Sequence, residues 1–344
     1  MISRRRISVA TAGAVTAAVT VLAGPAAAGS AGSTTAHGTV FFVNPVQSTG
    51  IETLTDQKDS DAAVPASAYK GVTLTNLDGS GYLRGDYANV INETGSPAYS
   101  ATGSFDYTRH DDRFEQVMAY YWVTEAQKYL QSLGFGHDLP PVNDRPQDVR
   151  IDQWGQDNSY FWDRHDVMRF GKGGVDDAED GEVIVHEYGH AVHNAQVPGF
   201  GSSLDAGSIG EAFGDYLAVS VGLAVAGPPA AGVPAACVAD WDSTSYTSTV
   251  PHCLRRVDTD LTVEQRRGEV HYDGQIWSRA LWDIRSGLGD YEANRIIIDA
   301  QFGFAPDTSF AAAANTTVAT AQRMYGNSAA KVVRQAFVDR HILS

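Results

Sequence analysis

Three histidines and a glutamate lie close together in the segment VIVHEYGHAVHNA, residues 183–195. His186 and His190 are four residues apart, so on a helix their side chains leave the same face and can share one metal ion. Glu187 lies about 100° further around the helix, where it can take a proton from a water that the ion binds. The alternative is a pair of core histidines with a solvated glutamate, because H-E-x-x-H is short enough to occur by chance.

The third metal ligand separates these alternatives, because a catalytic zinc takes three protein ligands and leaves a fourth position for water. One known spacing, H-E-x-x-H-x-x-G-x-x-H, needs glycine at position 193 and histidine at position 196. The chain has His193 and Gln196 there, so this spacing is excluded. His193 is therefore expected at the surface or as a cap near the end of the helix.

The segment SIGEAFGDYLAV, residues 208–219, offers another third ligand. Glu211 is followed one turn later by Asp215, and the apolar residues around them predict a buried helix. Buried carboxylates need partners, which a metal for Glu211 and a histidine N–H for Asp215 would supply. The alternative is a capping box formed by Ser208 and Glu211, which would make Glu211 a structural cap. We favour the ligand.

The elements that must position these residues change in type along the chain. Residues 39–107 are strand-like and are interrupted by turn residues, whereas Asp111–Leu133 has helical spacing and is the first long helix. VRIDQW and NSYFWDRHDVMRFG predict two further strands. Helices are expected at 209–223, at 275–285 and, twice or more, after Tyr291. A β-rich front half followed by a helical back half predicts an α+β fold.

Composition and the N-terminus indicate an exported protein. The 344 residues carry a net charge of −16, which argues against nucleic acid and against stable association with an anionic membrane, and we expect a monomer. Residues 1–28 combine a basic start, a short apolar run and an A-x-A site, which predicts a cleaved signal peptide; an uncleaved anchor is the alternative. Ser3-Arg4-Arg5 resembles a twin-arginine signal. Residues 29–38 are expected to form a flexible leader.

The two cysteines, Cys237 and Cys253, are the only ones in the chain. In an exported protein we expect them to form one disulfide that closes a local loop. Two free buried thiols are the alternative. Two cysteines this far apart exclude a C-x-x-C redox site.

HEYGH followed by E-A-F-G-D resembles the thermolysin and fungalysin families of gluzincin metallopeptidases. FFVNPV, LTNLDGSGYLRG, FEQVMAYYW and VHYDGQIWSRALWDI make the fungalysin catalytic domain the closer resemblance. The resemblance implies a zincin-like fold of two lobes, β-rich over 39–195 and helical over 196–344, with the zinc site between them. It also implies the following site: zinc on His186, His190 and Glu211, Glu187 as general base, and Asp215 bonded to His186.

The same resemblance assigns further residues to a secreted zinc endopeptidase acting on proteins or peptides. His271 matches the histidine that donates to the oxyanion. Asn158 and Ser159 take the substrate-binding positions of an edge strand. Either Arg255 or Arg256 supplies the arginine that grips the substrate carbonyl.

Several departures from the family pattern leave other functions open. Residues 196–207 lack the tyrosine that assists the oxyanion in thermolysin, Glu269 stands near the position of the aspartate that orients the donor histidine, and no long propeptide precedes the N-P-V segment. One alternative is therefore a catalytically impaired zinc-binding protein of the same fold that acts by interaction. An exopeptidase is a weaker alternative, because no acidic pocket for a terminal amine is evident.

Calcium is a second expected ion. Acidic residues crowd the stretch GGVDDAEDGE just before the histidine helix. Glu182 falls where thermolysin-like enzymes use a calcium carboxylate, with Asp180 as a second ligand. The alternative is that these acids complement the helix dipole, and it is favoured for Asp176 and Asp177.

Overall fold

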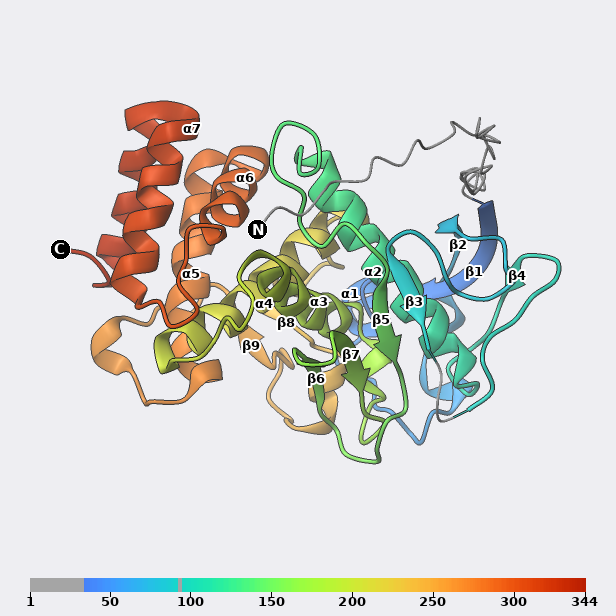
Figure 1. Ribbon diagram of the computed structural model, residues 1–344. Coiled ribbons are helices and arrows are strands. Elements are labelled where there is room, and N and C mark those ends of the chain that lie inside the picture. The colour runs from blue at the N-terminus through green and yellow to red at the C-terminus, as the bar shows by residue number, and fades with distance from the viewer. Residues whose placement is uncertain (1–33, 92–94) are drawn as a thin grey trace, which may run out of the picture. The chain divides into compact units, whose positions relative to one another are not determined.

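A three-stranded sheet begins the part of the chain that the structure, a computed structural model, describes: residues 34–91 and 95–344 (Figure 1). β1 (Thr34–Phe41) pairs antiparallel with β2 (Tyr69–Leu77), and β4 (Ser104–Phe105) lies on its other side. Residues 34–38 therefore belong to a strand, and the predicted leader is wrong for them, because their backbone groups pair with β2. The rest of the leader and the predicted signal peptide lie outside the described residues.

A second sheet, of four strands, lies next in the chain and has the order β3-β5-β7-β6. β3 (Ala88–Val90), β5 (Gln147–Arg150) and β7 (Val167–Phe170) run parallel, whereas β6 (Ser159–Trp162) is antiparallel to β7. The stretch predicted as a single strand over 158–171 is thus a hairpin, which turns at 163–166. Among the described residues β6 pairs with β7 alone, so its other edge has no partner strand there.

The long helix α2 (Arg113–Ser132) confirms the helix predicted over 111–133. It contacts β1, β3 and the third helix, α3. Its first turns bury Phe114 and Val117, and Trp122 is fully buried further on, with Nε1 donating to the carbonyl of Phe41. The shorter helical segments described are α1 (Pro45–Thr49), η1 (Asp61–Ala63), η2 (Ala66–Ala68), η3 (Asp177–Glu179), η4 (Asp242–Ser245) and η5 (Val263–Gln265).

The remaining long helices confirm the predicted change to helical structure. They are α3 (Gly181–Gln196), α4 (Leu204–Val225), α5 (Val270–Leu288), α6 (Asp290–Gln301) and α7 (Phe310–Asp339). Figure 1 shows α5, α6 and α7 side by side, away from the three-stranded and four-stranded sheets, and α7 is interrupted at Gly326. Residues 33–344 form one compact unit. The fold mixes sheets with a helical C-terminal part, as predicted.

Two predicted helices begin earlier than expected because residues outside the apolar pattern cap them. α4 starts at Leu204 rather than 209, since Ser203 accepts a hydrogen bond from the amide of Ala206. α5 starts at Val270 rather than 275, since the side chain of Glu269 accepts from two amides of its first turn. Ser203 follows the N-cap preference for small polar side chains, whereas Glu269 caps its helix although glutamate is not among the preferred residues.

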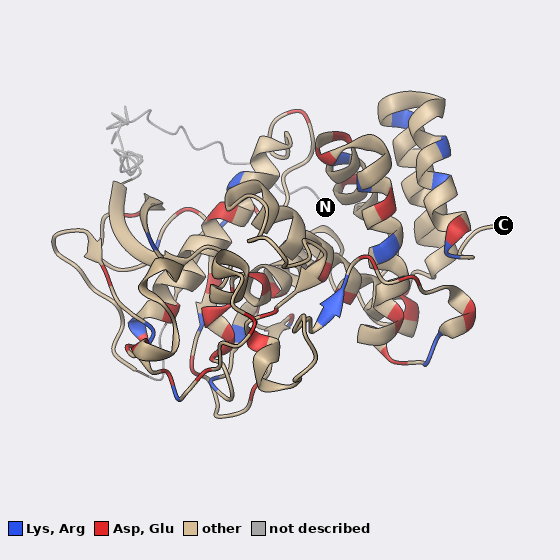
Figure 2. Cartoon of the chain, turned by 180° about the vertical axis from the view of Figure 1, so that it is seen from behind, with Lys and Arg blue, Asp and Glu red and all other residues tan. Residues whose placement is uncertain are grey.

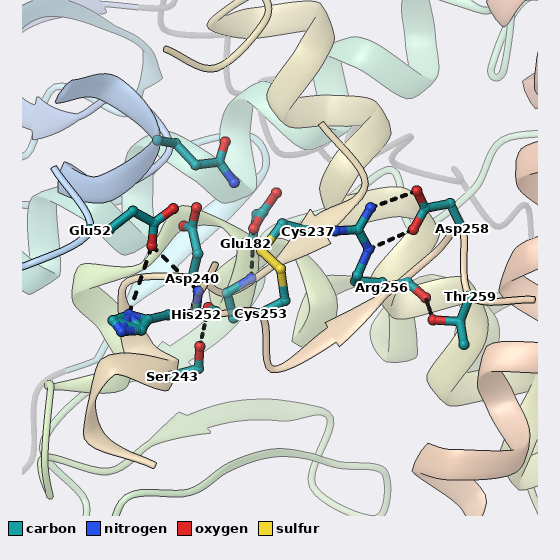
Figure 3. The surroundings of a disulfide bond; sticks show 12 residues. Glu52, Glu182, Cys237, Asp240, Ser243, His252, Cys253, Arg256, Asp258 and Thr259 are labelled. Carbon is teal, nitrogen blue, oxygen red and sulfur yellow. Dashed lines mark hydrogen bonds and ion pairs between the residues drawn. A yellow bond between two sulfur atoms is a disulfide. The ribbon is translucent and has the colours of Figure 1, made fainter. Parts of the chain in front are cut away.

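The long connection between α4 and α5, residues 226–269, contains the predicted disulfide. Cys237 and Cys253 are bonded, with an S–S distance of 2.02 Å (Figure 3). Cys237 belongs to β8 (Cys237–Val238), which pairs with β9 (Arg255–Arg256). The disulfide prediction is confirmed.

One helix among the described residues, α4, is long and apolar enough to cross a membrane. Most of its apolar stretch is buried inside the protein, so it is also what a core helix looks like. Most of its apolar residues belong to the main hydrophobic core, next to the candidate site.

Candidate active site

Glycines bring α3 and α4 close enough for their polar side chains to meet. A Cβ atom on Gly189 would lie 2.9 Å from the Cα atom of Gly214, which is closer than real Cβ contacts allow. A Cβ atom on Gly214 would lie 2.7 Å from Nδ1 of His186. The glycine in HEYGH, which weakens a helix by about 1 kcal/mol relative to alanine, therefore permits the backbone approach that the site needs.

Nitrogen and oxygen atoms of three side chains form a triangle between these helices. Nε2 of His186 lies 3.2 Å from Nε2 of His190. The carboxylate of Glu211 lies 3.4 Å from the first of these nitrogens and 3.6 Å from the second. Ligand atoms at about 2.0–2.1 Å from a tetrahedral zinc lie roughly 3.3–3.4 Å from one another. The three predicted ligands thus have the spacing that a zinc ion requires.

Asp215 supports the first of the predicted ligands. Its Oδ1 lies 2.9 Å from Nδ1 of His186, which leaves Nε2 of that ring directed at the triangle. Such a carboxylate fixes the tautomer and orientation of a metal-binding imidazole. The structure therefore brings Asp215 and His186 together as the resemblance implied.

The charges of the site favour a bound cation. Burial opposes protonation of His186, but hydrogen bonds to Asp215 and Glu211 raise its pKa to about 10. Burial lowers the pKa of His190 to about 4. Although burial acts the other way, hydrogen bonding and charge from the histidines lower the pKa of Glu211. The carboxylates of Asp215 and Glu211 thus hold a positive charge on His186, which is the role that a zinc ion would take.

The capping role considered for Glu211 is wrong. Ser208 lies inside α4, and its hydroxyl has no hydrogen-bond partner. Ser203 caps the helix instead. Glu211 is a half-buried residue of the second turn and faces the histidines.

Glu187 lies in the wall of a cleft beside the triangle. The cleft, about 520 Å³ in volume, is also lined by the three candidate ligands. Oε2 of Glu187 is buried without a partner. Burial raises the pKa of Glu187 to about 7, while the charge of His186 lowers it. A carboxylate with a pKa near neutrality is well suited to accept and return a proton.

β6 forms the opposite wall of this cleft. Asn158, which precedes β6, and Ser159, its first residue, both line the cleft. The Ser159 hydroxyl donates to Asp177, so that side chain is engaged in the protein rather than free for a ligand. The open edge of β6 offers backbone groups that an extended peptide can pair with.

His271 faces the cleft from the first turn of α5. Its Nδ1 lies 2.6 Å from Oε1 of Glu269 and its Nε2 lies 3.3 Å from Oε2 of Glu211. Its side chain is 51% exposed, so a substrate can reach it. Glu269 thus lies where it can orient the ring of His271, a role that the sequence alone did not assign to it. Asp273, the neighbour in the alternative interpretation, accepts from the amides of Arg267 and Gly268 instead.

The structure distinguishes between the two candidate arginines. Arg255 is largely buried and forms two hydrogen bonds of 2.7 Å to Asp215. Arg256 points the other way and pairs with Asp258 (Figure 3). The two arginines make up the short strand β9, the blue arrow in Figure 2, and alternate residues of a strand face opposite sides. Only Arg255 belongs to the candidate site.

His193 is not at the surface, and this prediction is wrong. Its residue is 2% exposed, and its ring lies 4.3 Å from that of Phe200 and 4.6 Å from that of Phe213, centroid to centroid. Neither ring nitrogen has a hydrogen-bond partner. The spacing that led us to exclude His193 as a ligand could not reveal its burial, because the aromatic residues that cover it come from a loop and from α4.

Amide donors surround the two acids predicted to bind calcium. Asp180 accepts from the amide of Glu182 and from Nδ2 of Asn44, which also donates to Asp240. Glu182 accepts from the amide of Ala239 at 2.7 Å. These hydrogen bonds give no support to a calcium ion held by Glu182 and Asp180.

The sequence did not identify several of the residues that line the cleft. Phe200 lies on the loop between α3 and α4, and Val270 precedes His271 on α5. Neither carries a motif, because each is brought to the cleft by the packing of helices that are distant in sequence. The only sequence signal for these two residues was that Phe200 is an aromatic residue in a glycine-rich loop.

Comparison with known proteins agrees with this geometry. Residues 239–342 match the family model described as thermolysin metallopeptidase, alpha-helical domain. This range contains Arg255 and His271, whereas the histidine helix and Glu211 precede it. None of the curated proteins compared with the chain matches it.

A solved structure of similar fold is the precursor of protealysin, a metalloproteinase from Serratia proteamaculans. The two chains share 18% identity with a TM-score of 0.56, and the match covers 75% of this chain and 88% of that one. The closer resemblance to fungalysins stays a prediction. The chain therefore has the fold of that metalloproteinase precursor, and its residues 239–342 match the model of the thermolysin alpha-helical domain.

Proposed function

We propose that the protein is a secreted zinc-dependent endopeptidase. The observation that carries the proposal is the spacing of 3.2–3.6 Å among the nitrogen and oxygen atoms of His186, His190 and Glu211. Beside it stands the unpaired carboxylate oxygen of Glu187, in the same cleft. A zinc ion held by the three ligands would polarise the substrate carbonyl and acidify a water molecule.

The chain's own residues supply the proton transfers. Glu187 accepts the proton of the attacking water at a carboxylate oxygen and then passes it to the amine that leaves. Its pKa, raised to about 7 by burial, lets it do both near neutral pH. Nε2 of His271 stabilises the charge that develops on the carbonyl oxygen, and Glu269 keeps its ring oriented through Nδ1.

Substrate binding follows from the cleft walls. An extended peptide pairs with the open edge of β6, where Asn158 and Ser159 lie. Arg255 contributes from the other side, held rigid by Asp215. Backbone pairing along a strand is independent of chain ends, which favours cleavage inside a polypeptide over removal of terminal residues.

The disulfide and the net charge support the proposed export and the proposed partners. The disulfide fits an oxidising compartment and therefore export. The net charge of −16 makes nucleic acid an unsuitable partner, and protein or peptide substrates are the partners expected of a monomer.

Mapping the cleavage sites of a peptide library by mass spectrometry tests the proposal. The mature protein, loaded with one equivalent of zinc, is expected to cut inside peptides, to stop when the zinc is chelated and to recover when zinc is restored. Stoichiometric zinc without cleavage would instead identify an impaired, zinc-binding protein of this fold. Release of terminal residues alone would identify an exopeptidase.

A further inference from the structure

A second, smaller cavity adjoins the substrate cleft next to the proposed zinc ligands. Its volume is about 110 Å³, whereas pockets for small-molecule ligands usually measure about 300–1,000 Å³, so its size suits one side chain of a larger substrate. The cleft and this cavity share Asn158, Ser159, His186, Glu187 and His271 in their walls. A substrate whose cleaved bond lies beside Glu187 therefore has a neighbouring residue within reach of the cavity.

The cavity has apolar walls and an acidic end. Val183, Val238 and Leu254 are among its lining residues, and Leu254 is 38% exposed, so it marks the side that opens to solvent. Asp177 and Asp242 also line the cavity, and they are only 2% and 3% exposed. These exposures place the two carboxylates deeper than Leu254. We call the cavity lined by these five residues the acidic pocket.

Each carboxylate of the acidic pocket has an oxygen that no group of the protein satisfies. Among the described residues, Oδ1 of Asp177 and Oδ1 of Asp242 have no hydrogen-bond partner. Oδ2 of Asp177 accepts from the hydroxyl of Ser159, which holds this carboxylate in place. Buried polar atoms normally have a hydrogen-bond partner, and buried charges are normally paired. The two free oxygens therefore indicate that the pocket receives a donor from outside the chain.

No cation of the protein fills this role. Within residues 34–91 and 95–344, no lysine or arginine forms an ion pair with Asp177 or Asp242. Arg255 also lines the pocket, but both of its hydrogen bonds go to Asp215. Burial raises the pKa of Asp177 to about 8, although the hydroxyl of Ser159 acts the other way. A cation placed beside this carboxylate would favour its charged form.

We propose that the acidic pocket selects substrates with a lysine or arginine directly next to the bond that is cleaved. This inference rests on the proposed endopeptidase function and adds the class of substrate to it. Both side chains combine an aliphatic stem with a cationic end, so the stem can lie against Val183, Val238 and Leu254 while the end donates to the two free oxygens. An apolar side chain would leave these oxygens unsatisfied, and an acidic one would be repelled.

Two peptides that differ in one residue measure this selection. One contains a single lysine, and the other has norleucine in its place, which lacks only the terminal ammonium group. With zinc-loaded mature protein, kcat/KM should be about 10²-fold or more higher for the lysine peptide, because a site with buried polar groups rejects a substrate that leaves them unpaired. Mass spectrometry should place the cut at a bond of the lysine. Equal kcat/KM values, with cleavage still observed, would overturn the selection but leave the endopeptidase function standing.

Asp177→Asn and Asp242→Asn test the two carboxylates separately. Each should lower kcat/KM for the lysine peptide by about tenfold or more, since a hydrogen bond to a charged group is lost. Each should leave kcat/KM for the norleucine peptide within a few-fold of wild type, which also shows that the variant is folded. Glu115→Gln is the matched control, because Glu115 is likewise a buried acid with an unpartnered oxygen but does not line the pocket. A preference for lysine that survives in both aspartate variants would contradict the proposal.

Binding to Glu187→Gln separates selection from catalysis. This variant is expected to keep zinc and to bind peptides without cutting them, so fluorescence anisotropy gives dissociation constants for the same two peptides, labelled. The lysine peptide should bind about tenfold more tightly or better. If the wild-type protein cuts neither peptide, this difference in affinity would still support the acidic pocket and would refute the endopeptidase function. Equal affinities in that case would overturn both.

Discussion

Arg255 and Asp215 form a two-point ion pair, with Nε–Oδ2 and Nη2–Oδ1 distances of 2.7 Å each. The same Oδ1 lies 2.9 Å from Nδ1 of His186. One carboxylate therefore links the proposed substrate arginine to a proposed zinc ligand. The ion pair lowers the pKa of Asp215 despite its burial and keeps it charged. Under the proposed function, substrate binding and metal binding would therefore depend on the same side chain.

Replacing Asp215 should therefore weaken zinc binding. Asp215→Asn removes the charge that orients His186 and leaves Arg255 buried without its partner, so we expect zinc affinity to fall by about 10- to 100-fold. Competition with a chromophoric chelator measures this. Asp258→Asn is the matched control, because it breaks the neighbouring pair with Arg256, which points away from the site. Equal zinc affinity in the two variants would show that Asp215 does not support the metal.

Glu187→Gln separates metal binding from proton transfer. The amide has the same shape but cannot accept the proton of the attacking water, so peptide hydrolysis should fall by about 10² to 10⁴-fold. Zinc content, measured by atomic emission, should stay at one equivalent because Glu187 is not among the ligands. Hydrolysis within a few-fold of wild type would remove Glu187 from the role of general base.

The elements that carry the site could be predicted from local sequence because each has its own periodicity or motif. The HEYGH spacing predicted which two histidines point together, and the apolar run after Glu211 predicted that this glutamate is buried. What could not be predicted depends on long-range packing. Nothing local to His193 indicates that Phe200 and Phe213 enclose it.

The two arginines illustrate the same limit. Arg255 and Arg256 are adjacent, and their side chains face opposite sides because both belong to β9, which pairs with β8. Each of these strands has two residues. No periodicity is visible in so short a strand.

His271→Ala should impair turnover more than binding. Removing Nε2 takes a donor from the developing oxyanion, which typically lowers kcat by about 10²- to 10³-fold, whereas KM should change little. Steady-state kinetics on a fluorogenic peptide measure both. His341→Ala is a suitable control, because His341 is similarly exposed and is also paired with a glutamate, Glu264, outside the cleft. A matching loss of activity in both variants would point to a general defect and contradict the assignment.

His193→Leu should make the protein less sensitive to acid. Burial lowers the pKa of His193 well below its ordinary value of 6.5. Below pH 6.5 the unfolded chain therefore takes up a proton that the folded chain refuses, so the unfolded state is favoured and stability falls as pH falls. Leucine binds no proton, and its side chain suits the apolar contacts with Phe200 and Phe213. Urea unfolding at pH 7 and pH 5 should thus show a smaller loss of stability in His193→Leu than in wild type. His137→Leu, at an exposed position, controls for the loss of a histidine as such. An identical loss between the two pH values in wild type and His193→Leu would mean that His193 is protonated in the folded protein.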